Sequence, residues 1–274
     1  YPVIGRLRYV FEHLGVFFRQ YFFAMDREEL PFNRAQRAWV ARAAKKLDST
    51  IAFGSTKPLN RPGDIFFLNS AFPPTKEEIE AHVPTPLTFG EGYVSEPYTA
   101  PSIFNISAMS YGALSGPAIE ALSAGAAQSG VWLNTGEGGL SPFHQTAACD
   151  LVFQIGTAKY GVRDDDGNLD IEKIASLAAI PEVRMFEIKL SQGAKPGKGG
   201  ILPAEKVTDL IATTRGIPSG EDSISPNRHP EVTDAVSLLD LIDRVRSASG
   251  KPTGIKPVSY THLRAHETRE DRVW

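Results

Sequence analysis

The first 100 residues show a helical pattern at their start and an irregular texture after it. Apolar residues recur three and four positions apart over Arg6–Phe23, which predicts an amphipathic helix. A second helix is predicted over Asn33–Lys46, with an asparagine as its N-cap and basic residues at its end. Proline and glycine are frequent over 53–100, where a helix is predicted only at Thr75–His82. We expect residues 1–100 to form a helical and covering segment without a core of its own.

The aromatic residues of Arg6–Phe23 leave two interpretations open. A helix with a strongly apolar aromatic face is typical of a membrane surface. The same face can also pack on the domain that follows, and this is the interpretation we prefer.

Residues 101–258 alternate short apolar runs with helical stretches. Strands are predicted at Ile103–Met109, Val131–Asn134, Leu151–Ile155, Met185–Leu190 and Thr253–Lys256. Helices are predicted at Gly116–Ser129, Ile171–Ala178, Pro203–Thr213 and Ser237–Ser249. This alternation predicts a parallel sheet with helical crossovers, either as a closed barrel or as an open doubly wound sheet.

Polar and glycine-rich sequence follows most of the predicted strands, for example at Ser110–Gly112, Thr135–Gly139 and Ser191–Gly193. An open sheet concentrates its ligand site at one switch point, whereas a barrel gathers all strand ends at one mouth. The pattern therefore favours a (β/α)₈ TIM barrel. A complete barrel takes about 250 residues, and residues 103–258 number 156. We therefore expect a partial α/β barrel of about five strands.

Composition narrows the function classes. The 274 residues are 42% hydrophobic and 22% charged, which is typical of a globular protein. A net charge of −3 gives no reason to expect nucleic acid as a partner. The single cysteine, Cys149, cannot form an internal disulfide or hold a zinc ion or iron–sulfur cluster. Because a lone thiol fits a reducing compartment, we expect a cytoplasmic protein or one on the cytoplasmic face of a membrane.

The last segment, 259–274, breaks the pattern of the fold. It is rich in Arg and His, and no periodic apolar face continues into it. It resembles the translation of a sequencing adapter, and we expect it to be a non-native tail. His262 and His266 are four residues apart, but Glu does not follow the first one as in H-E-x-x-H, so we predict no metal site.

Three longer motifs carry a family resemblance. Ile106–Ser115, Asn134–Gly139 and Glu187–Gly200 resemble the first, second and fourth strand ends of the FMN-binding barrel of glutamate synthase. Ile224–Pro226 and Gly254–Lys256 follow in the order of that family. The N-terminal section resembles the short members that have no glutaminase domain.

The resemblance implies a flavin-dependent oxidoreductase that acts on CH–NH₂ donors. Its reaction would be the reductive amination of 2-oxoglutarate by ammonia to give glutamate, with hydride from reduced FMN. It further implies an iron–sulfur cluster whose cysteines lie in the second half of the barrel, which this chain lacks. The electron donor stays open, and so does a membrane association of the parent protein through a segment that precedes Tyr1.

Five residues are candidates for binding the cofactor. The resemblance implies that Met109 and Ser110 contact the flavin, and it adds Thr135 at the second strand end. Gln154 lies within a strand, where an amide is costly to bury without a partner, so it either faces the flavin edge or is satisfied by neighbouring backbone. Lys256 ends a strand, where a cation near the flavin N1–O2 edge would stabilise the reduced ring.

Three residues are candidates for binding the substrate. Glu137 lies among glycines, which can form an anion-binding concavity or a flexible loop. Gln192 and Lys195 could bind a dicarboxylate as an orienting amide and a point charge, and the resemblance associates this loop with 2-oxoglutarate. The spacing excludes a Walker A phosphate loop. The catalytic residues stay unknown, because no side chain here is a persuasive general acid.

Two departures from the family pattern keep rival functions open. Ile201 stands where the family usually has glutamine after the paired glycines, and Leu140 stands where glutamate is common. They favour a non-catalytic flavin-binding paralogue. Another FMN barrel oxidoreductase, such as a hydroxy-acid oxidase or an inosinate-dehydrogenase-like enzyme, is the second rival, although Cys149 lies in the wrong motif for the latter.

Overall fold

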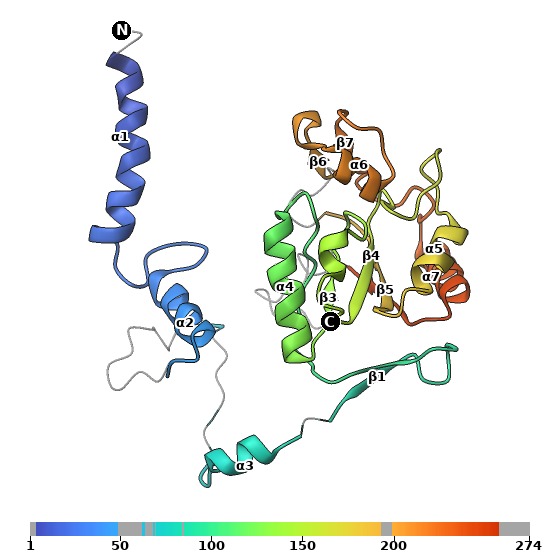
Figure 1. The fold of residues 1–274 in the computed structure, drawn as a ribbon, viewed down its shortest axis with the longest axis horizontal. Helices are drawn as coiled ribbons and strands as arrows, with labels where there is room; N and C mark the ends of the chain where they lie inside the picture. The colour runs from blue at the N-terminus through green and yellow to red at the C-terminus, as the bar shows by residue number, and fades with distance from the viewer. Residues whose placement is uncertain are drawn as a thin grey trace. The chain divides into compact units, whose positions relative to one another are not determined.

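A computed structural model describes residues 4–48, 62–63, 68, 70–83, 85–192 and 199–257 (Figure 1). The chain divides into two compact units, Tyr1–Ile79 and Glu80–Trp274. The predictions for Lys195 and for the tail 259–274 lie outside the described residues. Among the described residues, no helix has the length and apolar character needed to cross a bilayer.

The first unit contains the helices that its sequence pattern predicts. Its elements are α1 (Ile4–Phe18), a π-helical turn η1 (Arg19–Phe23), α2 (Arg34–Ala44) and the start of α3 (Lys76–Ala81), which includes the boundary between the units. Asn33 caps α2 as expected: its side chain accepts a hydrogen bond from the backbone of Gln36 at 3.1 Å, and the Gln36 side chain accepts one in return at 3.0 Å. Arg34 links α2 to η1 by donating to the carbonyl of Gln20 at 2.7 Å.

The second unit is built on a four-stranded parallel sheet. Its strands, in the order in which they pair, are β3 (Leu133–Asn134), β4 (Leu151–Ile155), β5 (Val183–Lys189) and β8 (Thr253–Lys256). Ile106 adds a parallel bridge to Leu133 on the outer side of β3. The order follows the chain and never reverses among these strands, so they contain no switch point of a doubly wound sheet.

Three crossover helices connect the strands: α4 (Gly116–Ser129), α5 (Ile171–Ala178) and α7 (Ala235–Ser249). Asp170 and Asp234 cap the starts of α5 and α7, since each carboxylate accepts hydrogen bonds from backbone N–H groups of the first turn. Gly130 and Gly250 end α4 and α7 in the left-handed conformation that glycine adopts without strain.

The three helices pack on the same face of the sheet. That face carries Leu151, Phe153 and Ile155 of β4 with Phe186 and Ile188 of β5, and these side chains form one core with residues of all three helices. The alternate residues point to the other face and include Val152, Gln154, Met185, Glu187 and Lys189. Helices on one face and polar side chains on the other fit a partial α/β barrel, although the described sheet is open.

Smaller elements surround the sheet. A hairpin joins β1 (Leu87–Phe89) to β2 (Tyr98–Ala100), and a second antiparallel pair joins β6 (Ile201–Leu202) to β7 (Ser223–Ile224). Between β6 and β7 lie a 3₁₀ turn η3 (Ala204–Lys206) and α6 (Asp209–Arg215), and another 3₁₀ turn, η2 (Pro142–Gln145), follows β3.

Three predictions need correction. The helix expected at Pro203–Thr213 is interrupted, because Val207 leaves the helical conformation and Thr208 then caps a new helix by accepting from the Ile211 N–H. The strand expected at Ile103–Met109 pairs through a single bridge at Ile106 rather than along its length. The segment over 53–100 is not irregular throughout, since it contains the hairpin of β1 and β2.

Candidate functional site

The carboxyl ends of the parallel strands lie at the same end of the sheet. The loops that follow them line a cavity of about 270 Å³. Its walls come from the loops after Ile106, β3, β4 and β5 and from the β6–β7 segment. The side chains that matter for its chemistry are Ser110, Glu137, Tyr160, Gln192, Ile201 and Arg215. Three of them, Ser110, Glu137 and Gln192, are predicted site residues.

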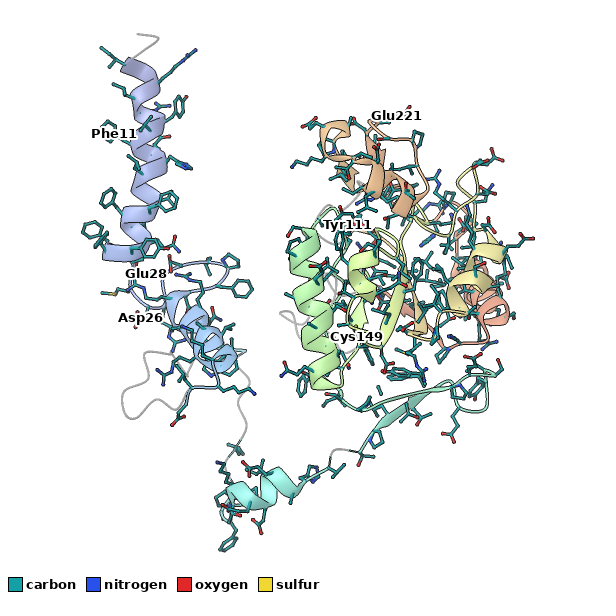
Figure 2. All side chains as sticks on the ribbon, viewed as in Figure 1. Phe11, Asp26, Glu28, Tyr111, Cys149 and Glu221 are labelled. Atoms are coloured by element: carbon teal, nitrogen blue, oxygen red, sulfur yellow. The ribbon has the colours of Figure 1, made fainter. Side chains whose placement is uncertain are left out.

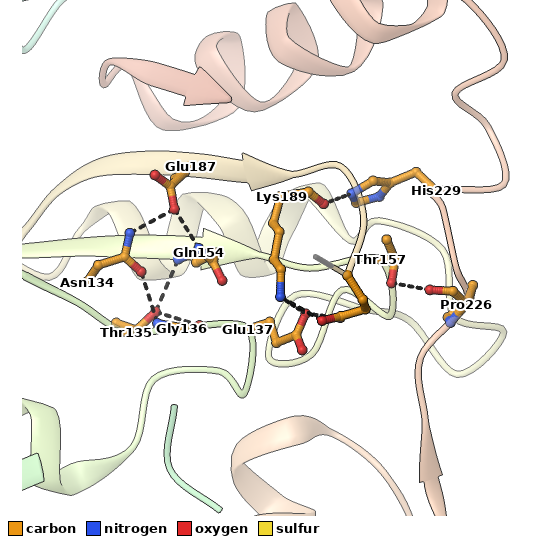
Figure 3. Close-up of polar contacts among 11 residues, drawn as sticks. Asn134, Thr135, Gly136, Glu137, Gln154, Thr157, Glu187, Lys189, Pro226 and His229 are labelled. Atoms are coloured by element: carbon orange, nitrogen blue, oxygen red, sulfur yellow. Dashed lines mark hydrogen bonds and ion pairs between the residues drawn. The ribbon is translucent and has the colours of Figure 1, made fainter. Parts of the chain in front are cut away.

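Glu137 lies at the centre of a small charged cluster (Figure 3). Its Oε2 atom accepts from Lys189 Nζ at 3.1 Å and from Gln192 Nε2 at 2.6 Å. Lys189 also donates to Gln192 Oε1 at 2.8 Å. The Glu137 and Lys189 side chains are 23% and 14% exposed, so this ion pair is screened less than one on the open surface. The three side chains hold one another in a fixed arrangement at the end of β5.

A second polar cluster lies on the face of the sheet opposite the three helices (Figure 3). Glu187 Oε1 accepts from Asn134 Nδ2 at 2.9 Å and from Gln154 Nε2 at 2.5 Å. Thr135 is fully buried, and its hydroxyl accepts from the Gln154 N–H at 3.1 Å and donates to the Gly136 carbonyl at 3.0 Å. The buried amide of Gln154 is thus satisfied by a carboxylate, which removes the cost of burying it alone.

Arg215 carries a buried positive charge into the cavity. Its guanidinium donates to Ser223 Oγ at 2.8 Å and to the Tyr111 carbonyl at 3.5 Å, and it lies 5.0 Å from the centre of the Tyr160 ring. Among the described residues, no carboxylate lies within ion-pair distance of it. Burial lowers the pKa of Arg215, while the field of Glu137 acts in the opposite direction. A buried guanidinium with neutral partners is a site for an anion.

His144 holds the first strand end in place. The Ser141 N–H donates to its Nδ1 atom at 3.2 Å, so Nδ1 is the acceptor and Nε2 carries the proton. Nε2 then donates to the Met109 carbonyl at 2.9 Å. Desolvation of the fully buried imidazole lowers its pKa, which keeps it neutral. The neutral ring is required because its Nδ1 atom must be unprotonated to accept from the Ser141 N–H.

Three contacts tie the segment 226–231 to the ends of β4 and β5. Thr157 donates to the Pro226 carbonyl at 2.6 Å, and Lys159 pairs with Glu231 at 3.2 Å. His229 Nε2 lies 2.9 Å from the Lys189 carbonyl (Figure 3). Burial lowers the pKa of His229 as well, so its neutral ring is the donor here. These contacts fix the backbone of Lys189 and, through it, the Glu137 cluster.

The predicted site residues that the structure describes separate into three groups. Ser110, Glu137 and Gln192 line the cavity. Met109, Thr135 and Gln154 lie behind it, where Met109 packs against the core. Lys256 lies opposite Lys189 in the register of β5 and β8. Lys195 lies outside the described residues.

Five residues of the site were not predicted from the sequence: Lys189, Glu187, Arg215, His144 and His229. A signal existed for the first two, because Glu187 and Lys189 alternate with Phe186 and Ile188 and therefore point away from the core together. Arg215 gave none, since an arginine in the last turn before a glycine is ordinary helix capping.

Comparison with known proteins identifies the family of this chain. Residues 75–270 match the family described as the conserved region in glutamate synthase. The chain belongs to the glutamate synthase family. This family match covers the whole described sheet and the cavity at its strand ends.

Relatives within the glutamate synthase family extend beyond this chain. A glutamate synthase large subunit-like protein, YerD, of Bacillus subtilis is 33% identical over 303 aligned positions, which cover 97% of this chain and 57% of the relative. An archaeal-type glutamate synthase [NADPH] of Thermotoga maritima is 39% identical over 54% of the chain and 27% of its own length. The archaeal glutamate synthase [NADPH] of Archaeoglobus fulgidus is 37% identical over 61% and 30%. The chain thus spans about half the length of the Bacillus relative.

Proposed function

We propose that this chain is part of a flavin-dependent oxidoreductase that makes glutamate from 2-oxoglutarate and ammonia with reduced FMN. The observation that carries the proposal is the buried charge of Arg215, which has no ion-pair partner among the described residues, in a cavity it shares with Glu137 and Gln192. The names of the relatives support the reaction class.

The cavity suits a dicarboxylate with a keto group. The guanidinium of Arg215 matches a carboxylate in shape and charge, and the amide of Gln192 can orient a second oxygen. Ile201 supplies an apolar wall for methylene groups. Glu137 places a negative charge in the same cavity, where it would stabilise the positive nitrogen that forms as ammonia condenses with the keto carbon.

The strand ends also suit a flavin. Lys189 and Lys256 are register partners on β5 and β8, and Lys189 pairs with Glu137, so Lys256 would bring a further positive charge to the strand ends, where a reduced ring would carry negative charge. His144 fixes the Met109 carbonyl, and thereby the turn that leads to Ser110. When bound, FMN would supply the hydride.

The test is an assay of the complete protein that contains this chain. Its flavin, once reduced, should be reoxidised by 2-oxoglutarate plus ammonium but not by either alone. Arg215→Lys keeps the charge and loses the planar fork, so the KM for 2-oxoglutarate should rise about ten-fold with unchanged FMN content. The matched control is Lys206→Gln, an exposed cation in the same loop. An unchanged KM in Arg215→Lys would move the substrate site elsewhere.

One observation favours a non-catalytic flavin-binding paralogue as the second candidate. Leu140, which replaces a glutamate common in the family, packs against the main core instead of offering a carboxylate to the site. Under that candidate the protein binds FMN, and neither 2-oxoglutarate nor ammonium changes the rate at which the reduced flavin is oxidised. A flavin reoxidised by a different keto acid would point to another FMN oxidoreductase.

A further inference from the structure

Exposed apolar side chains are concentrated in the first unit. Of the 33 large hydrophobic residues that are exposed in the described part of the chain, 18 lie within residues 4–48. Helix α1 contains no buried residue. Phe11, which is 70% exposed, projects away from the helix in Figure 2. Patches of this size usually mark a surface that something else covers.

Six apolar residues of α1 form one stripe. At 3.6 residues per turn, they fall within about a third of the helix circumference. The stripe consists of Leu7, Val10, Phe11, Leu14, Phe17 and Phe18. The π-helical turn η1 extends it with further exposed aromatic residues, among them Phe22 and Phe23.

Positive charge accompanies this stripe. Residues 4–48 contain nine Arg and Lys against five Asp and Glu, although the whole chain has a net charge of −3. Arg6 and Arg8 border the stripe on its two sides, and Arg42, Lys45 and Lys46 follow at the end of α2. A second copy of the chain would bring like charges together on this face, whereas an anionic surface would complement them.

We propose that α1 and η1 form a membrane-docking surface that lies flat on a bilayer with anionic headgroups. The stripe would enter the boundary between headgroups and acyl chains, where aromatic rings are favoured, and the bordering arginines would contact the headgroups. This surface would lie on the bilayer without crossing it, because α1 is shorter than a helix that spans a bilayer. The proposal does not depend on the reaction proposed for the cavity.

The experiment floats the 274-residue chain through a density gradient with vesicles, which separates bound protein from aggregates. The vesicles contain either phosphatidylcholine alone or phosphatidylcholine with phosphatidylglycerol. The chain should float with the anionic vesicles, and less so at high salt. Leu14→Glu should weaken binding at least about ten-fold, and Arg6→Gln about five-fold, the equivalent of one basic contact.

Val16→Glu is the matched control, because Val16 is equally apolar and 62% exposed but lies on the opposite side of α1. It should change binding less than about two-fold. Circular dichroism should show the same helix content for all variants, since α1 contributes nothing to the core.

Three results would overturn the proposal. A chain that stays dispersed and does not float with anionic vesicles would do so, as would an equal loss in Leu14→Glu and Val16→Glu. Self-association that Leu14→Glu abolishes, without flotation, would assign the stripe to a second copy. If the chain is dispersed and trypsin does not cleave at Arg8 and Arg19 in the absence of lipid, another part of the protein covers these residues. The stripe would then be a contact surface for that part rather than for a membrane.

Discussion

At the scale of single residues, two buried histidines make the site sensitive to acid. His144 and His229 both hold backbone carbonyls through a neutral ring, and burial lowers the pKa of each. Below pH of about 6.5 the unfolded chain therefore binds protons that the folded chain does not. The stability that these rings contribute is present above that pH and is lost as the pH falls.

The resulting prediction concerns thermal melting of the complete protein. Its melting temperature should drop between about pH 7.5 and pH 5.5, and the slope should be smaller in His229→Gln, whose side chain cannot take up the proton. His13→Gln, on the exposed helix α1, serves as the control and should keep the original slope. A His229→Gln variant with the full slope would show that other groups cause the acid sensitivity.

Sequence reasoning reached the residues of the site that follow strands and missed those that approach from elsewhere. Ser110, Glu137 and Gln192 were predictable, because parallel strands bring their carboxyl ends to one side. Arg215 enters from α6, whose position depends on the pairing of β6 with β7 rather than on local pattern. Its role therefore follows only from the folded structure.

At the scale of elements, the turn after β3 depends on a glycine with no room for a side chain. Gly136 has φ of +66°, and a Cβ atom there would lie 2.6 Å from the Ser110 N atom. Gly136→Ala should therefore destabilise the protein by about 1–3 kcal/mol and displace Ser110 from the cavity.

The matched variant is Gly125→Ala in the middle of α4, where a Cβ atom would meet nothing within 4 Å. Alanine favours the helix there, so this variant should be more stable by about 0.5–1 kcal/mol. Thermal melting of the two variants gives the comparison. Equal stability of both would mean that the turn adjusts to a side chain.

Elements with strong local signals were predicted well, and those set by distant contacts were not. The bounds of α4 and α5 match the prediction residue for residue, because Pro117, Gly130 and Asp170 mark where helices begin and end. The hairpin of β1 and β2 lacks such a signal. Its residue Tyr98 is buried and donates a hydrogen bond to Asp150, 52 positions away in the sequence, at 2.9 Å.

At the scale of the whole molecule, the open side of the sheet limits what this chain can do alone. β8 is the last strand of the described sheet, and Ile255 on it is 42% exposed. TIM barrels usually bind phosphate with the loops after strands seven and eight. We predict that the 274-residue chain neither closes a barrel nor retains FMN.

Purification of residues 1–274 tests this prediction directly. Absorbance should show little bound flavin, and melting should be broad because the outer edge of β8 has no partner strand among the described residues. A yellow product with a sharp transition would contradict it. The complete protein, purified in parallel, should release FMN rather than a dinucleotide flavin.

The order of the sheet, β3, β4, β5 and then β8, has a consequence for biosynthesis. Each strand leaves the ribosome after the strand it will pair with, so the sheet can grow in step with translation. Only β8 follows its partner at a distance, after β6, α6, β7 and α7. The growing edge is always the newest strand. Once β8 has joined, its outer edge is the growing edge of the described sheet, and a further strand could pair there in the same stepwise way.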